Sequence, residues 1–187
     1  MDHSGSMAKI LQVVGPDTPI ICSKMGQKNL AAHFHKDWNF KVVGSGEELN
    51  LGRRTLMFLE TRMLHWPDSM FTYINEDKIL FSSDAFGQHY AGNELFADEM
   101  GGAVMPHAKK YYANILMHFS PQVLKLVETV KELGLEFNLI CPDHGVYWRK
   151  DIHQIIDAYV DWANQERVRK AVLVYDSMWQ STEKMAN

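Results

Sequence analysis

The chain has 187 residues, 46% of them hydrophobic, which is enough for one domain with a substantial core. It contains no run of about 18 apolar residues and its formal net charge is −4, so we expect neither a membrane span nor nucleic-acid binding. Its two cysteines, Cys22 and Cys141, are too few for a disulfide framework, and its polar first residues do not resemble a signal peptide, so we expect a reducing, cytoplasmic setting.

The first third of the chain predicts helices that alternate with short strands. Apolar side chains at helical spacing indicate helices over 7–14 and 24–35. The intervening stretch 44–50 is polar and typical of a turn. Short apolar runs predict three strands, over 19–22, 40–43 and 54–60.

The stretch 62–91 places a histidine and an aspartate at the ends of apolar runs. His65 follows one such run, and the Pro67 just after it prevents the strand from continuing, because proline cannot donate to a β-ladder. Two further strands are predicted over 70–74 and 79–81, joined by a polar turn. Asp84 then emerges where the second of these strands stops.

The second half of the chain continues the alternation. Helices are predicted over 93–100, 106–118, 121–133 and 151–165, and prolines at the start of two of them suit a first helical turn. Strands are predicted over 136–141, just before His144, and over the Val-rich stretch 170–175. Strands that alternate with helices favour a layered α/β (α+β) fold.

A metal site is one interpretation of these strand ends. The candidate ligands are His65, Asp84 and His144, with Asp2-His3 as a fourth position. Imidazoles and carboxylates without thiolates suit zinc, iron or manganese, and a carboxylate such as Asp84 can bridge two metals about 3.5–4 Å apart. The alternatives are ordinary surface or core histidines, a helix N-cap role for Asp84, and a disordered terminus at Asp2-His3.

Four motifs in this order resemble the flavodiiron proteins, also called A-type flavoproteins or rubredoxin:oxygen oxidoreductases: LHWPDSMFTY, ILFSSDAFGQHYA, ICPDHGVYWR and VYDSMWQSTEKMA. In that family a metallo-β-lactamase-like αββα sandwich carries a non-haem diiron site. A flavodoxin-like domain that carries FMN follows it. The resemblance implies an enzyme that reduces O2 to water, NO to N2O, or both.

The resemblance also implies metal ligands. The family's H-x-E-x-D-H motif would end on Asp2 and His3, His65 would be the next ligand, Asp84 the bridging carboxylate and His144 the last histidine. Asp2, Asp84 and His144 would hold one iron, with His3 as a further candidate, and His65 and Asp84 would hold the other. We interpret the adjacent residue 143 as a turn residue rather than as an acceptor behind the ligands.

The FMN of the family would be held at the C-terminal end of this chain. Ser177, Ser181 and Thr182 match the family's phosphate-binding loop, which also includes Met178 and Trp179 here. Hydroxyls and backbone N–H groups at a helix N-terminus suit a phosphate. From the residues alone, a capped helix after a strand explains the same pattern.

The resemblance divides the chain into two parts. We expect residues 1–168 to be the diiron domain, N-terminally incomplete, and residues 169–187 to begin the flavodoxin-like domain with its first strand. The first His and the Glu of the H-x-E-x-D-H motif have no counterpart in the chain, so we expect missing segments of the same protein, or another chain, to complete the sandwich. The family also implies a head-to-tail homodimer and rubredoxin or a similar electron donor.

Two other function classes remain open from the sequence. One is a metallo-β-lactamase-like hydrolase that uses a metal-bound hydroxide, because His65, Asp84 and His144 would serve such a site equally well. The other is a metal-poor, inactive fragment, because a half-built site should bind metal weakly.

Overall fold

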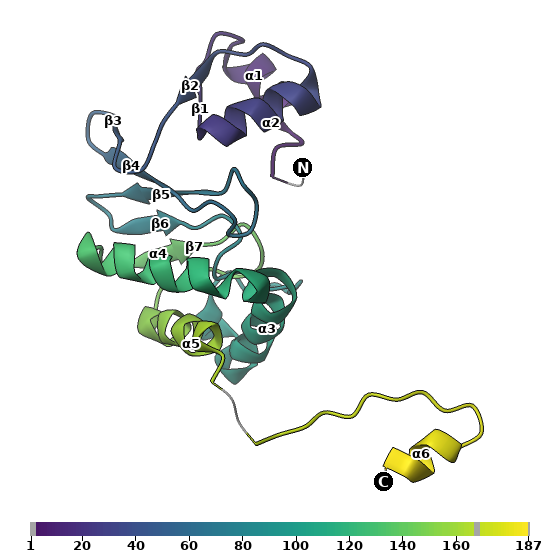
Figure 1. Cartoon of the computed structure of the whole chain (residues 1–187). Coiled ribbons are helices and arrows are strands. Elements are labelled where there is room, and N and C mark those ends of the chain that lie inside the picture. The colour runs from purple at the N-terminus through teal and green to yellow at the C-terminus, as the bar shows by residue number, and fades with distance from the viewer. Residues whose placement is uncertain (1–2, 167–168, 187) are drawn as a thin grey trace.

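The computed structural model of the chain describes residues 3–166 and 169–186. The N-terminal part is a small unit in which α1 (Met7–Val14) and α2 (Lys24–Phe34) accompany two parallel strands, β1 (Ile20–Cys22) and β2 (Phe40–Val42). In Figure 1 this unit, in purple and dark blue, lies beyond the edge of the main sheet. Ser23 caps α2, since its hydroxyl accepts a hydrogen bond from the Gly26 N–H at 3.1 Å.

The main sheet has five strands in the order β3-β4-β5-β6-β7. The first three pairings are antiparallel, whereas β6 and β7 pair in parallel. The strands are β3 (Glu48–Asn50), β4 (Thr55–Glu60), β5 (Met70–Ile74), β6 (Ile79–Phe81) and β7 (Leu139–Cys141). Because parallel strands end at the same edge of a sheet, the loops that follow β6 and β7 emerge side by side.

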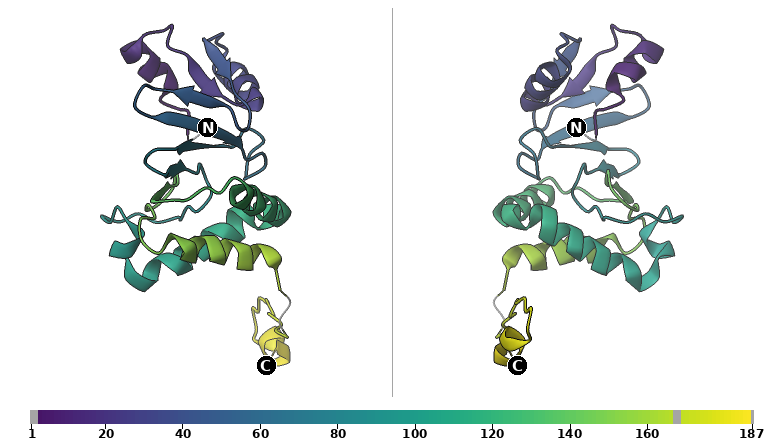
Figure 2. Two further views of the ribbon diagram at one scale, coloured as in Figure 1. Left: turned by 90° about the vertical axis from the view of Figure 1, so that its left-hand side faces the viewer. Right: turned by 90° about the vertical axis from the view of Figure 1, so that its right-hand side faces the viewer.

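Helices pack against one side of this sheet. The main ones are α3 (Val104–Tyr111), α4 (Ser120–Glu132) and α5 (Ile152–Asn164). Short helical segments complete this layer: η1 (Ala97–Glu99), η2 (Gly101–Ala103), η3 (Tyr112–Leu116) and η4 (Met117–Phe119). The helices α4 and α5 lie next to one another, and the two views of Figure 2 show the helical layer gathered beside the lower strands. Among the described residues, no helix is both long enough and apolar enough to cross a membrane.

The hydrophobic core lies between the sheet and these helices. Phe71 and Tyr73 of β5 are buried, as is Leu80 of β6, which pairs with Tyr73. They belong to the same cluster as Ile155 and Tyr159 of α5. Alternation along a strand sends every second side chain to the other face.

That other face of the sheet is much less covered by the described residues. Thr72 and Ile74 of β5 and Ile79 of β6 are only half-buried, and Phe81 is exposed. Antiparallel sheets can face water on one side, but their solvent face is then usually polar. Here the uncovered face is mostly apolar, so the chain presents a sheet surface suited to a second layer.

Most predicted elements are confirmed, and two stretches that contribute to the main sheet differ at its two ends, β3 and β7. The stretch 44–50 was expected to be a turn, but Glu48–Asn50 forms β3, because an edge strand can be polar and short when one side pairs with β4. The strand predicted over 136–141 begins only at Leu139.

The helix predicted over 93–100 is wrong except for the single 3-10 turn η1. Phe96 forms a bridge with Tyr147, and the Ala97 N–H donates to the Tyr147 carbonyl at 2.8 Å. The Glu99 carboxylate accepts from the N–H groups of Leu95 and Phe96. These hydrogen bonds, one to a distant carbonyl and two to a carboxylate, take the place of those that a helix would make. The helix predicted over 106–118 begins earlier, at Val104, and its α-helical part ends at Tyr111.

The strand predicted over 170–175 is also wrong in the described structure. These residues have no strand assignment, and Val172, Leu173 and Val174 are exposed. In Figure 1 the yellow segment runs away from the helices before the short helix α6 (Ser181–Ala186). A strand needs a neighbour to pair with, and none of the described residues lies alongside this segment.

A cluster of charges joins the segment after β7 to η1. Arg149 Nε donates to Asp98 Oδ1 at 2.9 Å, Lys150 Nζ lies 2.9 Å from Asp98 Oδ2, and the Arg149 guanidinium lies 3.7 Å from the centre of the Phe96 ring. The hydrogen bonds from Arg149 and Lys150 lower the pKa of Asp98 to about 2. These contacts, called the Asp98 clamp below, join η1 to the chain segment that follows the loop after β7.

Truncation of the core should destabilise the protein strongly. Ile155 is fully buried at 0% exposure, and Ile155→Ala is expected to lower the free energy of unfolding by about 2–5 kcal/mol, because it removes packed methyl groups and leaves a cavity. Urea unfolding followed by circular dichroism measures this. Ile10→Ala at a position that is 53% exposed is the matched control, with an expected change within about 0.5 kcal/mol. Equal costs for both variants would contradict this placement of the core.

The Asp98 clamp should make stability depend on pH in the acid range. The pKa of Asp98 is about 2 in the folded protein against an ordinary 3.8, so the stabilisation is present above about pH 4 and is lost as the pH falls towards 2. Asp98→Asn should flatten the pH dependence of the urea midpoint over this window. Asp37→Asn, at an exposed carboxylate away from the clamp, should leave the slope as in the parent protein.

Candidate metal centre

Asp84 is a buried carboxylate just beyond the end of β6. The turn that carries it is closed by Ser82, whose buried hydroxyl donates to the Ala85 carbonyl at 2.7 Å. Asp84 itself is only 3% exposed. Burying a carboxylate is costly unless charges or hydrogen bonds compensate it, so its surroundings are informative.

His144 is held beside Asp84 by the fully buried Gln88. The Gln88 N–H donates to the His144 carbonyl at 3.0 Å, and the Val146 N–H donates to Gln88 Oε1 at 2.7 Å. Gln88 Nε2 donates in turn to the Phe86 carbonyl at 2.7 Å. A single amide side chain thus ties the loop after β6 to the loop after β7.

His65 comes from the loop between β4 and β5. The Thr61 N–H donates to the Ser69 carbonyl at 3.0 Å, and the Ser69 hydroxyl accepts from the Trp66 N–H at 3.1 Å. Leu64, which precedes His65 through a cis peptide bond, is buried in the core. The loop is therefore closed by its own hydrogen bonds and anchored by one apolar side chain.

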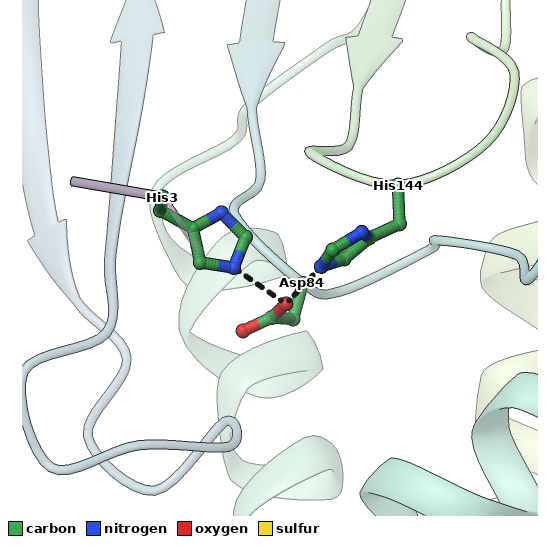
Figure 3. Close-up of side chains that lie close together, drawn as sticks. All are labelled: His3, Asp84 and His144. Carbon is green, nitrogen blue, oxygen red and sulfur yellow. Dashed lines mark ion pairs between the residues drawn. The ribbon is translucent and has the colours of Figure 1, made fainter. Parts of the chain in front are cut away.

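Three imidazoles converge on the Asp84 carboxylate. The Nε2 atoms of His3 and His144 each lie 3.2 Å from Asp84 Oδ1. Figure 3 shows both imidazoles beside this carboxylate, with the two ion pairs dashed. His65 Nε2 lies 3.5 Å from the other oxygen, Oδ2. The two oxygens of one carboxylate thus face different histidines.

The donor set suits a transition metal. The ligand atoms of His3, Asp84 and His144 all lie within 4.8 Å of one another. Two ligand atoms that are each about 2.1 Å from one ion lie about 3.0–3.4 Å apart at octahedral or tetrahedral angles, and the 3.2 Å spacings fall in this range. Imidazole nitrogen with carboxylate oxygen is a common set for iron, zinc and manganese.

Two further residues contact this cluster, and the sequence interpretation missed their roles. Asp143 Oδ2 lies 2.8 Å from His3 Nδ1, so the turn residue is also a hydrogen-bond acceptor behind His3, contrary to our interpretation. A carboxylate that accepts from Nδ1 fixes the imidazole tautomer and leaves Nε2 facing Asp84. The Tyr111 hydroxyl donates to Asp84 Oδ1 at 3.3 Å. The position of Asp143 beside His144 was a usable signal, whereas nothing in the local sequence marked Tyr111.

Among the described residues, the candidates at the C-terminal end are not brought to this cluster. Asp2 lies outside the described residues. The exposed residues Met178 and Trp179 lie on the segment before α6, and Ser181 begins that helix at the far end of the chain in Figure 1.

An open cleft of about 790 Å³ borders the cluster on the side of the N-terminal unit. Its lining includes His3 and Asp84, together with Trp66, Cys22 and Asn29. The cluster is therefore reachable from one side, while Asp84 is buried from the other.

The chain matches known proteins along its length. Residues 2–145 match the family model described as "ODP family beta lactamase". The chain belongs to this ODP family.

Relatives and solved structures add detail to this assignment. The chain is similar to a protein named nitric oxide reductase from Moorella thermoacetica and to a rubredoxin-oxygen oxidoreductase from Megalodesulfovibrio gigas. Each is 45% identical over 100% of this chain and 47% of the relative. The solved rubredoxin oxygen:oxidoreductase of Desulfovibrio gigas matches with a TM-score of 0.94 and 44% identity, over 99% of this chain and 47% of that chain. The flavodiiron protein of Giardia intestinalis matches with a TM-score of 0.89 and 38% identity, over 98% and 45% of the two chains.

These matches confirm the resemblance to flavodiiron proteins and the α/β fold with a β-lactamase-like domain that the motifs predicted. The ODP chain spans about half the length of the curated relatives that it matches.

Gly145 should be required for the geometry of the His144 loop in this ODP chain. Its φ is +86°, and a Cβ there would overlap Gln88 Oε1 and lie 2.8 Å from the Gln88 carbonyl oxygen. Gly145→Ala should therefore lower the free energy of unfolding by at least about 1 kcal/mol more than an alanine in a left-handed backbone conformation without such an overlap.

Gly46→Ala is the matched control for that prediction. Gly46 has a φ of +83°, but nothing lies within 4 Å of its added Cβ. Gly46→Ala should therefore lower the free energy of unfolding only by the cost of the left-handed backbone, about 1–2 kcal/mol. If urea unfolding gave the same loss for both variants, Gln88 would not hold the loop as described.

Proposed function

We propose that this chain is the iron-binding part of a flavodiiron oxidoreductase that reduces O2 to water, NO to N2O, or both. The observation that carries the proposal is the Asp84 carboxylate, which faces His3 and His144 through one oxygen and His65 through the other. The relatives named as nitric oxide and oxygen reductases support the same reaction class.

The proposed ligand assignment follows the family resemblance. Asp84, His144 and His3, with Asp2, would hold one iron, and Asp84 with His65 would hold the other. Two ferrous ions held by these residues would supply electrons and a binding place for the gas. One shared carboxylate can hold two cations close together because its two oxygens point in different directions.

The protein's own groups prepare this site. Asp143 accepts from His3 Nδ1 and so orients the other nitrogen towards Asp84. Gln88 holds the His144 loop, and the Tyr111 hydroxyl donates to Asp84, which keeps the carboxylate in one orientation. Rigid loops lower the cost of collecting the ligands around each ion.

We also propose the division of the chain into a diiron domain over 1–168 and the start of a flavodoxin-like domain over 169–187. In that proposal Ser177, Met178, Trp179, Ser181 and Thr182 would belong to the loop that holds the FMN phosphate. The family motif supports this assignment.

Partners are proposed on the same basis. The uncovered apolar face of the sheet, with Thr72, Ile74 and Phe81, suits packing against another sheet from missing segments of the same protein or from another chain. A head-to-tail homodimer would bring the FMN of one protomer to the irons of its partner. A relative named rubredoxin-oxygen oxidoreductase supports rubredoxin or a similar protein as the electron donor.

Metal content and gas consumption test the proposal directly. The full-length protein, purified without oxygen, should contain about two irons per protomer and consume O2 or NO when a reductant is supplied. His144→Ala should lose iron and lower gas consumption at least about 100-fold, because a ligand matters at least as much as the residues behind it. Iron assay, Mössbauer spectroscopy and an oxygen or NO electrode measure these.

His153→Ala is the matched control, since His153 is an exposed histidine on α5, and it should keep both iron and activity. A protein that binds zinc, consumes neither gas and hydrolyses an ester or amide would instead be a hydrolase. A protein with neither metal nor activity would be an inactive assembly component. Either result would overturn the proposed function.

A further inference from the structure

A second cavity lies on the opposite side of the metal-ligand loops from the open cleft. It has a volume of about 180 Å³ and sits between the sheet and the helical layer. Phe71 and Leu80 line it from the strands, Val127 lines it from α4 and Ile156 lines it from α5. Lys131, which is exposed, stands at its outer end, so the cavity reaches towards the protein surface there.

The cavity offers almost nothing to a water molecule. Its lining is hydrocarbon and aromatic except for the Lys131 ammonium and the Tyr159 hydroxyl, and that hydroxyl already accepts from the Phe86 N–H at 2.6 Å. A buried water needs two to four polar partners. Apolar cavities of about 150 Å³ stay dry and bind small apolar molecules such as xenon.

The inner wall of this cavity consists of the residues that adjoin the metal ligands. Leu64 precedes His65 in the chain, and Ala85 and Phe86 follow Asp84. All three wall residues are buried. The loops after β4 and β6 thus contribute both to the cavity wall and to the metal cluster, and Leu64 and Ala85 of the wall are direct chain neighbours of the ligands His65 and Asp84.

We propose that this cavity takes up a small apolar diatomic gas and delivers it to the buried side of the metal cluster. This inference rests on the proposed function, because O2 and NO are the gases that it would serve. Uncharged, weakly polar gases leave water readily for an apolar space, whereas ions and water do not. The open cleft remains the route for polar species, so the two sides of Asp84 would serve different molecules.

Xenon is the probe for occupancy. Crystals of the full-length protein under xenon pressure should show an anomalous peak among Phe71, Val123 and Val127. Val127→Phe, which adds a bulky ring at a residue that lines the cavity, should remove that peak. Leu124→Phe is the matched control, because Leu124 lies on the same helix but does not line the cavity, and it should keep the peak.

Kinetics test delivery. Val127→Phe should raise the KM for the gas several-fold while kcat at saturating gas and the iron content stay unchanged, because only access is altered. Leu124→Phe should leave all three values as in the parent protein.

Three results would overturn the inference: no xenon in the cavity, a side chain from elsewhere in the full-length protein that fills it, or an unchanged KM in Val127→Phe. A protein that reduces gas but takes up no xenon overturns this inference alone. A protein that reduces no gas overturns the proposed function, and the delivery role with it, whatever the xenon result.

Discussion

The parallel pairing of β6 with β7 is the constraint on which the candidate site depends. Leu80 lies opposite Ile140 and Phe81 opposite Cys141, so both strands end at one edge of the sheet. The chain then turns twice at that edge and presents a buried carboxylate from one loop and an imidazole from the other. Every other pairing in the sheet is antiparallel, and an antiparallel β7 would have carried His144 to the opposite edge.

Hydrogen bonds between the two loops convert this proximity into a fixed geometry. The Asp143 N–H donates to the Ser83 carbonyl at 2.8 Å, and Gln88 bonds to the backbone on both sides of Gly145. Because Gln88 is buried with its amide satisfied at both ends, moving either loop would leave polar atoms unpaired. The ligand positions therefore depend on residues that would never touch a metal.

The two faces of the sheet differ in what covers them. One face packs against α4 and α5 and contains both the main core and the apolar cavity behind the ligands. The other face, with Ile74 and Phe81, is left largely uncovered by the described residues. The site lies at the edge between them, where a buried carboxylate can be held by the core and still be reached from the cleft.

The sequence by itself determined most of the elements and the chemical character of the site. Strands over 70–74 and 79–81 follow from local apolar runs, and the family motifs identified His65, Asp84 and His144 as metal-binding candidates. Only the tertiary structure decided which strands are neighbours. It alone placed Asp143 and Tyr111 against the cluster, formed β3 from a polar stretch and left 170–175 without a strand. The physical reason is that hydrophobic periodicity is a local signal, whereas strand partners and hydrogen bonds join residues far apart in the chain, and their pairing depends on which segments the fold brings together.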